Sequence, residues 1–210
     1  MRRRSAIPSY YGKNIARQAQ QKHLHGKKPE SERVDENRQA AAHVIGICYL
    51  VALNEKYGIG EQRLQRVADV AEAEAGKYDL NKRSVGAVRA KKKLDEDLGD
   101  LLPGGFLLPI TKPPKTKRDW LLLGEQREAA ELVVKMYAIA THKALKYGTE
   151  RIGTAVKGAE ENFRKFGEWA EGGEYYGYAM LARQLSAILG EPVEVDERNA
   201  GEPIFSNTLD

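Results

Sequence analysis

The stretches ENRQAAAHVI (residues 36–45) and EQREAAELVV (residues 125–134) read almost alike, and this likeness decides the predicted fold. The matching positions are Glu36, Arg38, Ala40, Ala41, Val44 and Ile45 in the first stretch, and Glu125, Arg127, Ala129, Ala130, Val133 and Val134 in the second. Self-similarity at a fixed spacing is typical of a chain that repeats one supersecondary unit. The sequence therefore predicts two copies of one helical module.

The likeness continues beyond a Tyr-Gly turn, where residues 55–78 align with residues 145–166 if two residues are skipped after the Tyr-Gly pair. The pairs that result are Arg63 with Arg151, Leu64 with Ile152, Ala71 with Ala159, Glu72 with Glu160, and Tyr78 with Phe166. Chance similarity between two amphipathic helices is the competing explanation. The shared order of helix, Tyr-Gly break and second helix favours duplication.

Each copy predicts a helix, a tight turn, a second helix and a third segment that ends at a glycine. In the first copy the first helix covers 36–56, and Gly58 is placed to end it in the left-handed conformation. The second helices each carry one apolar face at helical spacing. Those faces are Leu64, Val67, Ala68, Ala71, Ala75 and Tyr78 in the first copy, and Ile152, Ala155, Val156, Ala159, Phe163 and Phe166 in the second.

The predicted fold class is all-α, with two tandem three-helix modules packed as one helical bundle. The predicted parts are a basic N-terminal arm (1–35), the first repeat (36–99), a linker (100–124), the second repeat (125–190) and a C-terminal tail (191–210). Four prolines and three glycines in 101–124 exclude a continuous helix there. Two structures fit the linker: a short β-hairpin that pairs GFLLPI with WLLL, or an irregular segment whose leucines pack against the bundle.

The composition fits a helical protein from a reducing compartment. Of 210 residues, 41% are hydrophobic and 30% charged, which allows a normal core beneath a charged surface. Cys48 is the only cysteine, so no internal disulfide can form, and its apolar surroundings predict a buried thiol. The longest apolar run, 44–53, is half the length of roughly 20 residues that a membrane-spanning helix needs. We therefore expect no membrane partner and a cytoplasmic location.

No catalytic motif is recognisable in the sequence. It contains no phosphate-binding loop, no dinucleotide fingerprint and no nucleophile elbow. His23 and His25 flank a leucine in the basic arm without the further ligands that a metal site needs. His43 and His142 lie on the two first helices at positions that do not match. The sequence thus predicts a non-enzymatic protein with no cofactor and no metal.

Basic side chains give the functional prediction. Treated as one helix, residues 79–99 place Lys82, Arg89, Lys92 and Lys93 within one arc of about 100°, with Leu80, Ala87, Leu94 and Leu98 opposite. Cations at helical spacing suit successive backbone phosphates. The candidate nucleic-acid-binding residues are Arg2, Arg3, Arg4, Lys13, Arg17, Lys82, Arg83, Arg89, Lys92, Lys93, Lys115, Lys117 and Arg118. A merely solvated face is the alternative, which the net charge of only +4 favours.

The stretches KYGIGEQRLQRVADVAE (56–72) and YDLNKRSVGAVRAKKKLDEDLG (78–99) resemble small helical accessory proteins of phages and prophages of Gram-positive bacteria. The motif residues are Tyr57, Gly58, Gly60, Arg63, Leu64 and Val67. The resemblance covers about sixty residues of the first copy, and the second copy follows it only in outline, since it lacks the second glycine. It implies a mobile-element protein in a bacterial cytoplasm and carries no assigned activity.

That context gives two functional hypotheses of different classes. In the first, the protein binds DNA or RNA as a regulator or replication accessory. In the second, it is an anti-defence inhibitor, for example of the anti-CRISPR kind, that blocks a host protein or ribonucleoprotein. The inhibitor would use the loop 111–119 and three tyrosines, Tyr175, Tyr176 and Tyr178, because aromatic side chains are enriched at interfaces. A third hypothesis is a structural protein that self-associates, for instance as a homodimer.

Overall fold

The computed structural model describes residues 30–110 and 113–190, and within these ranges the chain is helical and contains no strand. The helices are α2 (Glu30–Tyr57), α3 (Glu61–Val85), α4 (Ala87–Leu98), α5 (Lys117–Leu145), α6 (Thr149–Glu171) and α7 (Glu174–Leu189), and a single 3₁₀ turn, η1 (Gly99–Leu101), follows α4. The predicted all-α class is confirmed.

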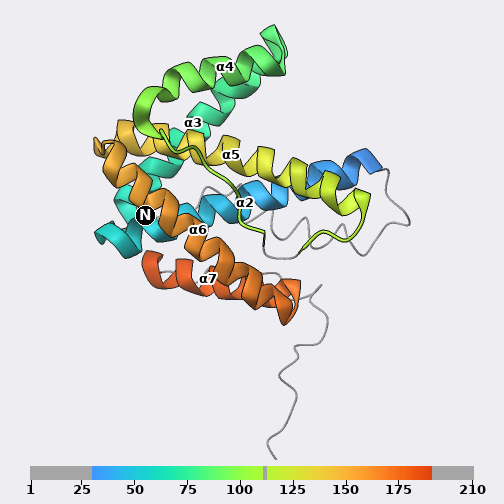
Figure 1. The fold of residues 1–210 in the computed structure, drawn as a ribbon. Coiled ribbons are helices and arrows are strands. Elements are labelled where there is room, and N and C mark those ends of the chain that lie inside the picture. The colour runs from blue at the N-terminus through green and yellow to red at the C-terminus, as the bar shows by residue number, and fades with distance from the viewer. Residues whose placement is uncertain (1–29, 111–112, 191–210) are drawn as a thin grey trace, which may run out of the picture.

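The long helices α2 and α5 run side by side in the same direction through the middle of the molecule (Figure 1). Contacts at three levels fix this parallel alignment. Near the start of the pair, Gln126 donates a hydrogen bond of 2.8 Å to Asn37. In the middle, the rings of Tyr49 and Tyr137 lie 5.3 Å apart. At the end, the rings of Tyr57 and Tyr147 meet edge to face at 5.2 Å.

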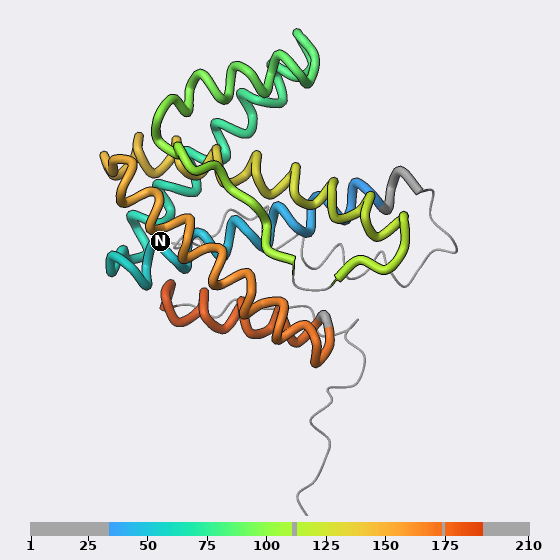
Figure 2. The backbone as a smooth tube through the Cα atoms, in the orientation of Figure 1, coloured from blue at the N-terminus to red at the C-terminus, as the bar shows by residue number. Residues whose placement is uncertain are grey.

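The remaining helices flank this central pair, with α3 and α4 on one side and α6 and α7 on the other (Figure 2). The pairing crosses between the two halves of the chain, since α6 packs on α2 while α3 packs on α5. Gly158 of α6 lies so close to α2 that an added Cβ would come within 2.9 Å of the Ala52 Cβ. On the other side, Lys143 of α5 pairs with the buried Glu74 of α3 at 2.6 Å.

The apolar faces predicted for the second helices are the ones that the fold buries. The buried members are Leu64, Val67, Ala68, Ala71 and Tyr78 on α3, and Ile152, Ala155, Val156, Ala159 and Phe163 on α6. Ala75 and Phe166 are half-buried at the edges of these faces. Each large apolar side chain removed from water contributes about 1.5–3 kcal/mol, so these two stripes account for much of the core. Cys48 is fully buried on α2, as predicted.

The turn after α2 follows the prediction. The helix ends at Tyr57, and Gly58 takes φ +61°, a left-handed conformation that costs glycine little. Its N–H donates to the Asn54 carbonyl at 2.7 Å, which satisfies one of the carbonyls that a helix end leaves free. Gly60 then begins α3 in extended backbone, with φ −79°.

The turn after α5 corrects the predicted alignment of the two copies. There the left-handed residue is Lys146, with φ 59°, and Gly148 is the extended residue that begins α6. Lys146 and Gly148 thus stand where Gly58 and Gly60 stand in the first turn, in both cases 88 positions later (58 to 146, 60 to 148). At these turns the spacing is 88 residues without a gap, whereas the opening stretches are 89 residues apart, and Lys146 stands where the first turn has Gly58.

Hydrogen bonds across the two turns support the corrected spacing. The Asn54 amide donates to the Ile59 carbonyl at 3.0 Å, and a ring nitrogen of His142 lies 2.8 Å from the Tyr147 carbonyl. These two bonds join positions that again differ by 88 (54 to 142, 59 to 147). His43 and His142 do not correspond, as expected, but His142 has a counterpart in Asn54.

The linker forms no hairpin in the part of it that the structure describes. The WLLL stretch (120–123) belongs to α5, which begins at Lys117 because Thr116 and Asp119 form a reciprocal capping box. Residues 105–110 form no regular secondary structure, and Gly105 takes φ +64°. Phe106 and Leu108 are buried in the core, whereas Leu107 between them is 65% exposed.

Candidate nucleic-acid interface

The third segment of the first half is a bent helical hairpin rather than one helix. α3 continues through Lys82 and Arg83 to Val85, Gly86 turns the chain with φ +85°, and α4 begins at Ala87. A glycine suits this turn because other residues rarely adopt that backbone angle. The prediction that Lys82 shares one helix face with the cations of α4 is therefore wrong. The sequence did contain a signal for this break, since a glycine inside a helical pattern weakens the helix by about 1 kcal/mol.

Five predicted cations of this segment lie on either side of Gly86, in the last turn of α3 and the first two turns of α4. We call this group, Lys82, Arg83, Arg89, Lys92 and Lys93, the cationic tip; all five are exposed. Residues 79–94 hold six Lys or Arg and a single acid, whereas residues 95–100 hold four acids and no Lys or Arg. Charge is thus segregated along the hairpin, which projects from the central helices with its turn outermost (Figure 1).

Several cations of the tip have no strong protein partner. Among the residues that the structure describes, Lys82, Arg83 and Arg89 make no hydrogen bond or ion pair. Lys92 lies 4.0 Å from Glu96, a distance at which an exposed pair contributes little. Lys93 donates to the side-chain oxygen of Asn81 at 3.2 Å, a contact that leaves its charge uncompensated. These side chains are free to pair with an external anion.

Two of the four acids at the base of the hairpin, Asp95 and Asp97, are in contrast paired with lysines. Asp95 accepts from Lys135 of α5 at 2.8 Å, and Asp97 accepts from Lys77, whose pKa this hydrogen bond raises. Lys91 is turned inward to Glu128 of α5, and the hydrogen bond lowers the pKa of that carboxyl. Local pairs therefore compensate part of the negative charge at the base, whereas the cations near Gly86 lack close acidic partners in the described part of the chain.

Of the four residues predicted to form the apolar side of this segment, two are buried and two are exposed. Leu94 and Leu98 are buried on α4, together with Ala90, against α3 and α5. Leu80, within α3, is 68% exposed, and Ala87, the first residue of α4, is also exposed. Leu80 and Val88 add apolar surface to the hairpin next to its cations.

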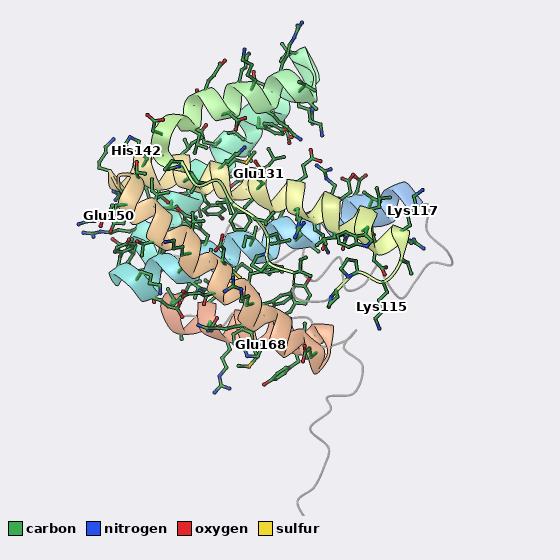
Figure 3. The ribbon with its side chains drawn as sticks, in the orientation of Figure 1. Lys115, Lys117, Glu131, His142, Glu150 and Glu168 are labelled. Carbon is green, nitrogen blue, oxygen red and sulfur yellow. The ribbon has the colours of Figure 1, made fainter. Side chains whose placement is uncertain are left out.

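The loop cations form a separate group at the start of α5. Lys115 precedes the helix, and Lys117 and Arg118 lie in its first turn, all exposed. Figure 3 places Lys115 and Lys117 at the end of α5 opposite to His142. Lys91 of the hairpin meets α5 at Glu128, eleven residues beyond Lys117 or about 16 Å of helix. Lys115, Lys117 and Arg118 are therefore a group of cations separate from the cationic tip.

The arm cations fall outside the residues that the structure describes. They are Arg2, Arg3, Arg4, Lys13 and Arg17, and the same holds for His23 and His25. Their assignment to nucleic-acid binding stays a prediction from sequence.

The three tyrosines proposed for partner binding are half-buried on α7. The ring of Tyr178 meets Phe166 of α6 edge to face at 5.3 Å and packs against the core. Tyr176 lies beside Gly172 at the turn into α7. Larger exposed apolar side chains occur elsewhere, at Trp120 and Leu121 of α5, which are 57% and 53% exposed. Neither was predicted as a partner-binding residue, because the sequence placed both in a linker that could be a hairpin or an irregular segment.

The described ranges contain no cluster of side chains suited to hold a metal. No group of three His, Cys, Asp or Glu side chains there is placed to hold a metal ion. Burial lowers the pKa of His43 to about 4, so this ring is neutral near pH 7. Burial also raises the pKa of the Cys48 thiol, which keeps it protonated and inert.

Compared with protein families, curated proteins and solved structures, the chain matches none of them. None of the helices in the described residues is both long and apolar enough to cross a membrane. The case for function therefore depends on the surface of the molecule itself.

Proposed function

We propose that the protein is a non-enzymatic nucleic-acid-binding protein whose cationic tip contacts backbone phosphates. The observation that carries the proposal is the segregation of charge along the α3–α4 hairpin, with two of its acids paired at the base and no cation of the tip in a close ion pair with any described residue. A helix face that only keeps the protein soluble does not require its acids and cations to be segregated, because alternating charges make a surface equally soluble.

The chemistry of the tip fits a phosphate backbone. Lysine and arginine side chains that neutralise phosphates release condensed counterions, and this release supplies most of the affinity for duplex nucleic acid at low salt. Cations on two helices joined by one turn present a compact group that matches neighbouring phosphates. No base-reading side chain is evident, so the expected binding is largely independent of sequence.

Charge reversal at the tip tests the proposal. The variant Arg83→Glu, Arg89→Glu, Lys92→Glu should bind a short fluorescent duplex at least about tenfold more weakly at low salt than the unmodified protein does. Anisotropy titrations between roughly 50 and 200 mM salt should show the slope of log affinity against log salt reduced in magnitude by about 2 to 3.

A matched control separates the tip from net charge. The variant Lys157→Glu, Arg164→Glu, Arg183→Glu makes the same charge change at exposed positions of α6 and α7. It should keep most of the affinity. Equal loss in both variants would show that only net charge matters, and no duplex or single-strand binding by the unmodified protein at low salt would reject the proposal.

The runner-up function is inhibition of a host protein or ribonucleoprotein, in the mobile-element setting that the sequence resemblance implies. The observation in its favour is the exposure of Trp120 and Leu121 beside the loop cations. Exposed aromatic and leucine side chains suit a protein interface better than a phosphate backbone. Capture from nuclease-treated bacterial lysate, with a Trp120→Ala, Leu121→Ala variant as control, would support it only if a stoichiometric partner is lost in the variant.

We also propose that the two halves are copies of one three-helix module. The proposal is supported by the shared 88-residue spacing of the turns and by matching packing, in which α2 lies on α6 as α5 lies on α3. The third helices match as well, with Ala90, Leu94 and Leu98 of α4 and Leu181, Leu185 and Leu189 of α7 buried at equal spacing.

A further inference from the structure

The first helix of each half makes its main contacts with the other half of the chain. α2 packs along α5 and α6, and α5 packs along α2 and α3. Within one half, α2 meets α3 only around the turn, and the same holds for α5 and α6. The second helix of each half is covered on one side by the third helix of its own half and on the other by the first helix of the opposite half.

Polar contacts at the centre follow the same crossing pattern. The fully buried Asn162 of α6 donates to Glu55 and to the Cys48 carbonyl of α2, at 3.1 and 3.4 Å. At the position 88 residues earlier, Glu74 of α3 is buried and pairs with Lys143 of α5 at 2.6 Å. Buried polar groups are costly to leave unpaired, so each half depends on the other to satisfy them.

The outer contacts between the halves are also reciprocal. α4 of the first half forms two ion pairs with α5, Lys91 with Glu128 and Asp95 with Lys135. α7 of the second half lies against α2. At the turns, the hydroxyl of Tyr57 donates to the Arg151 carbonyl at 2.9 Å.

We propose that residues 30–110 and 113–190 form an intertwined pair that associates through these surfaces and does not need the peptide link between them. The binding partner of each half is the other half. The apolar face of α2, with Ile45, Val51 and Leu53 fully buried, packs mainly against α5 and α6 of the other half. The proposal is independent of nucleic-acid binding.

Cleavage of the folded chain tests the proposal. A short protease site inserted between Pro113 and Pro114 leaves the buried Phe106 and Leu108 with the first half and the capping box of α5 with the second. After cutting, the two fragments should elute together at the volume of the uncut protein. They should also unfold in one transition, and its midpoint should rise with protein concentration, as it does for a two-chain complex.

A variant at the crossing contact, with a control on the same helix, gives a second readout. Gly158→Leu places side-chain atoms against Ala52 of α2, whereas Gly153→Leu on the same helix meets no atom within 4 Å of its Cβ. In the cut protein, Gly158→Leu should weaken association of the fragments by at least about tenfold, and Gly153→Leu should leave it nearly unchanged.

Three outcomes would overturn the proposal. The first is separation of the fragments into two folded species, each with its own unfolding transition. The second is loss of structure in both fragments on cutting, which would show that the link is required. The third is equal fragment affinity in Gly158→Leu and Gly153→Leu, which would place the association elsewhere.

Discussion

The hairpin of α3 and α4 and the hairpin of α6 and α7 bury similar residues and expose different ones. On their inner sides, α4 and α7 each present three apolar residues at matching spacing to the core. On their outer sides, residues 79–94 carry six Lys or Arg and one acid, whereas residues 173–190 carry one arginine and one glutamate. α7 instead exposes parts of its tyrosines.

This difference between the two hairpins shows that neighbouring helices restrict the residue types on the inner side of a helix and not those on its outer side. A side chain that faces α2 or α5 must fit a closely packed surface, so both halves keep small and branched apolar residues there. A side chain that faces water meets no such limit. The two halves therefore resemble each other where they touch, and the surface that differs is the one available for binding.

The largest expected effect tests the equality of the two cores. Leu64→Ala and Ile152→Ala remove matching side chains that are 2% and 0% exposed. Each should lower the free energy of unfolding by about 2–5 kcal/mol, because both leave a cavity between a second helix and the opposite first helix. Urea denaturation measures both values.

The control for this pair is Leu80→Ala, at a position 68% exposed, which should change the free energy of unfolding by no more than about 0.5 kcal/mol. The comparison of the halves breaks down if one of the two core variants proves as harmless as Leu80→Ala.

An effect of intermediate size concerns His43, a buried histidine that the first half has and the second half lacks. Burial lowers the pKa of His43 from 6.5 to about 4, so the unfolded chain takes up a proton that the folded chain excludes. The stability due to the neutral ring is complete above pH 6.5 and is lost as the pH falls toward 4. Between pH 8 and pH 5, stability should fall by about 1–2 kcal/mol on account of this residue.

His43→Gln should remove that part of the pH dependence in denaturation curves recorded at several pH values. At the 88-residue spacing of the turns, the second half has Glu131, paired with Lys135 at 2.6 Å, and so has no comparable ring. An unchanged slope between pH 5 and 7 in His43→Gln would argue that another group is responsible.

The smallest expected effect tests the equality of the two turns. Gly60 and Gly148 begin α3 and α6 with φ −79° and −90° and no side-chain cap, and no atom lies within 4 Å of an added Cβ. Gly60→Asp and Gly148→Asp should each raise stability by about 0.5 kcal/mol, through a new cap and the helix dipole. Thermal melts should show a rise of about 1–3 °C.

Gly58→Asp serves as the contrast, since its φ of +61° is unfavourable for aspartate, and it should lower the melting temperature. If Gly60→Asp stabilises the chain while Gly148→Asp destabilises it, the two turns are not equivalent.

Periodicity in the sequence was sufficient to predict the second helices and their buried faces. The spacing of Leu64, Val67 and Ala71 places them on one side of a helix, and the fold buries that side. Gly58 was recognisable as a helix end for a similarly local reason, because few other residues adopt its backbone angle cheaply. The hairpin at Gly86 had a local signal too, but a strong cationic pattern on both sides of it outweighed the glycine.

Sequence by itself determined that this protein is helical, where its second helices lie and that its basic residues concentrate around residues 82–93, because these follow from local chemistry and spacing. Only the tertiary structure decided that each first helix packs on the opposite half, that Lys91 turns inward to Glu128 while Arg89 stays exposed, and that the two turns align without a gap. Those outcomes depend on which surfaces meet, and contacts between residues nearly ninety positions apart leave no periodic trace in either segment.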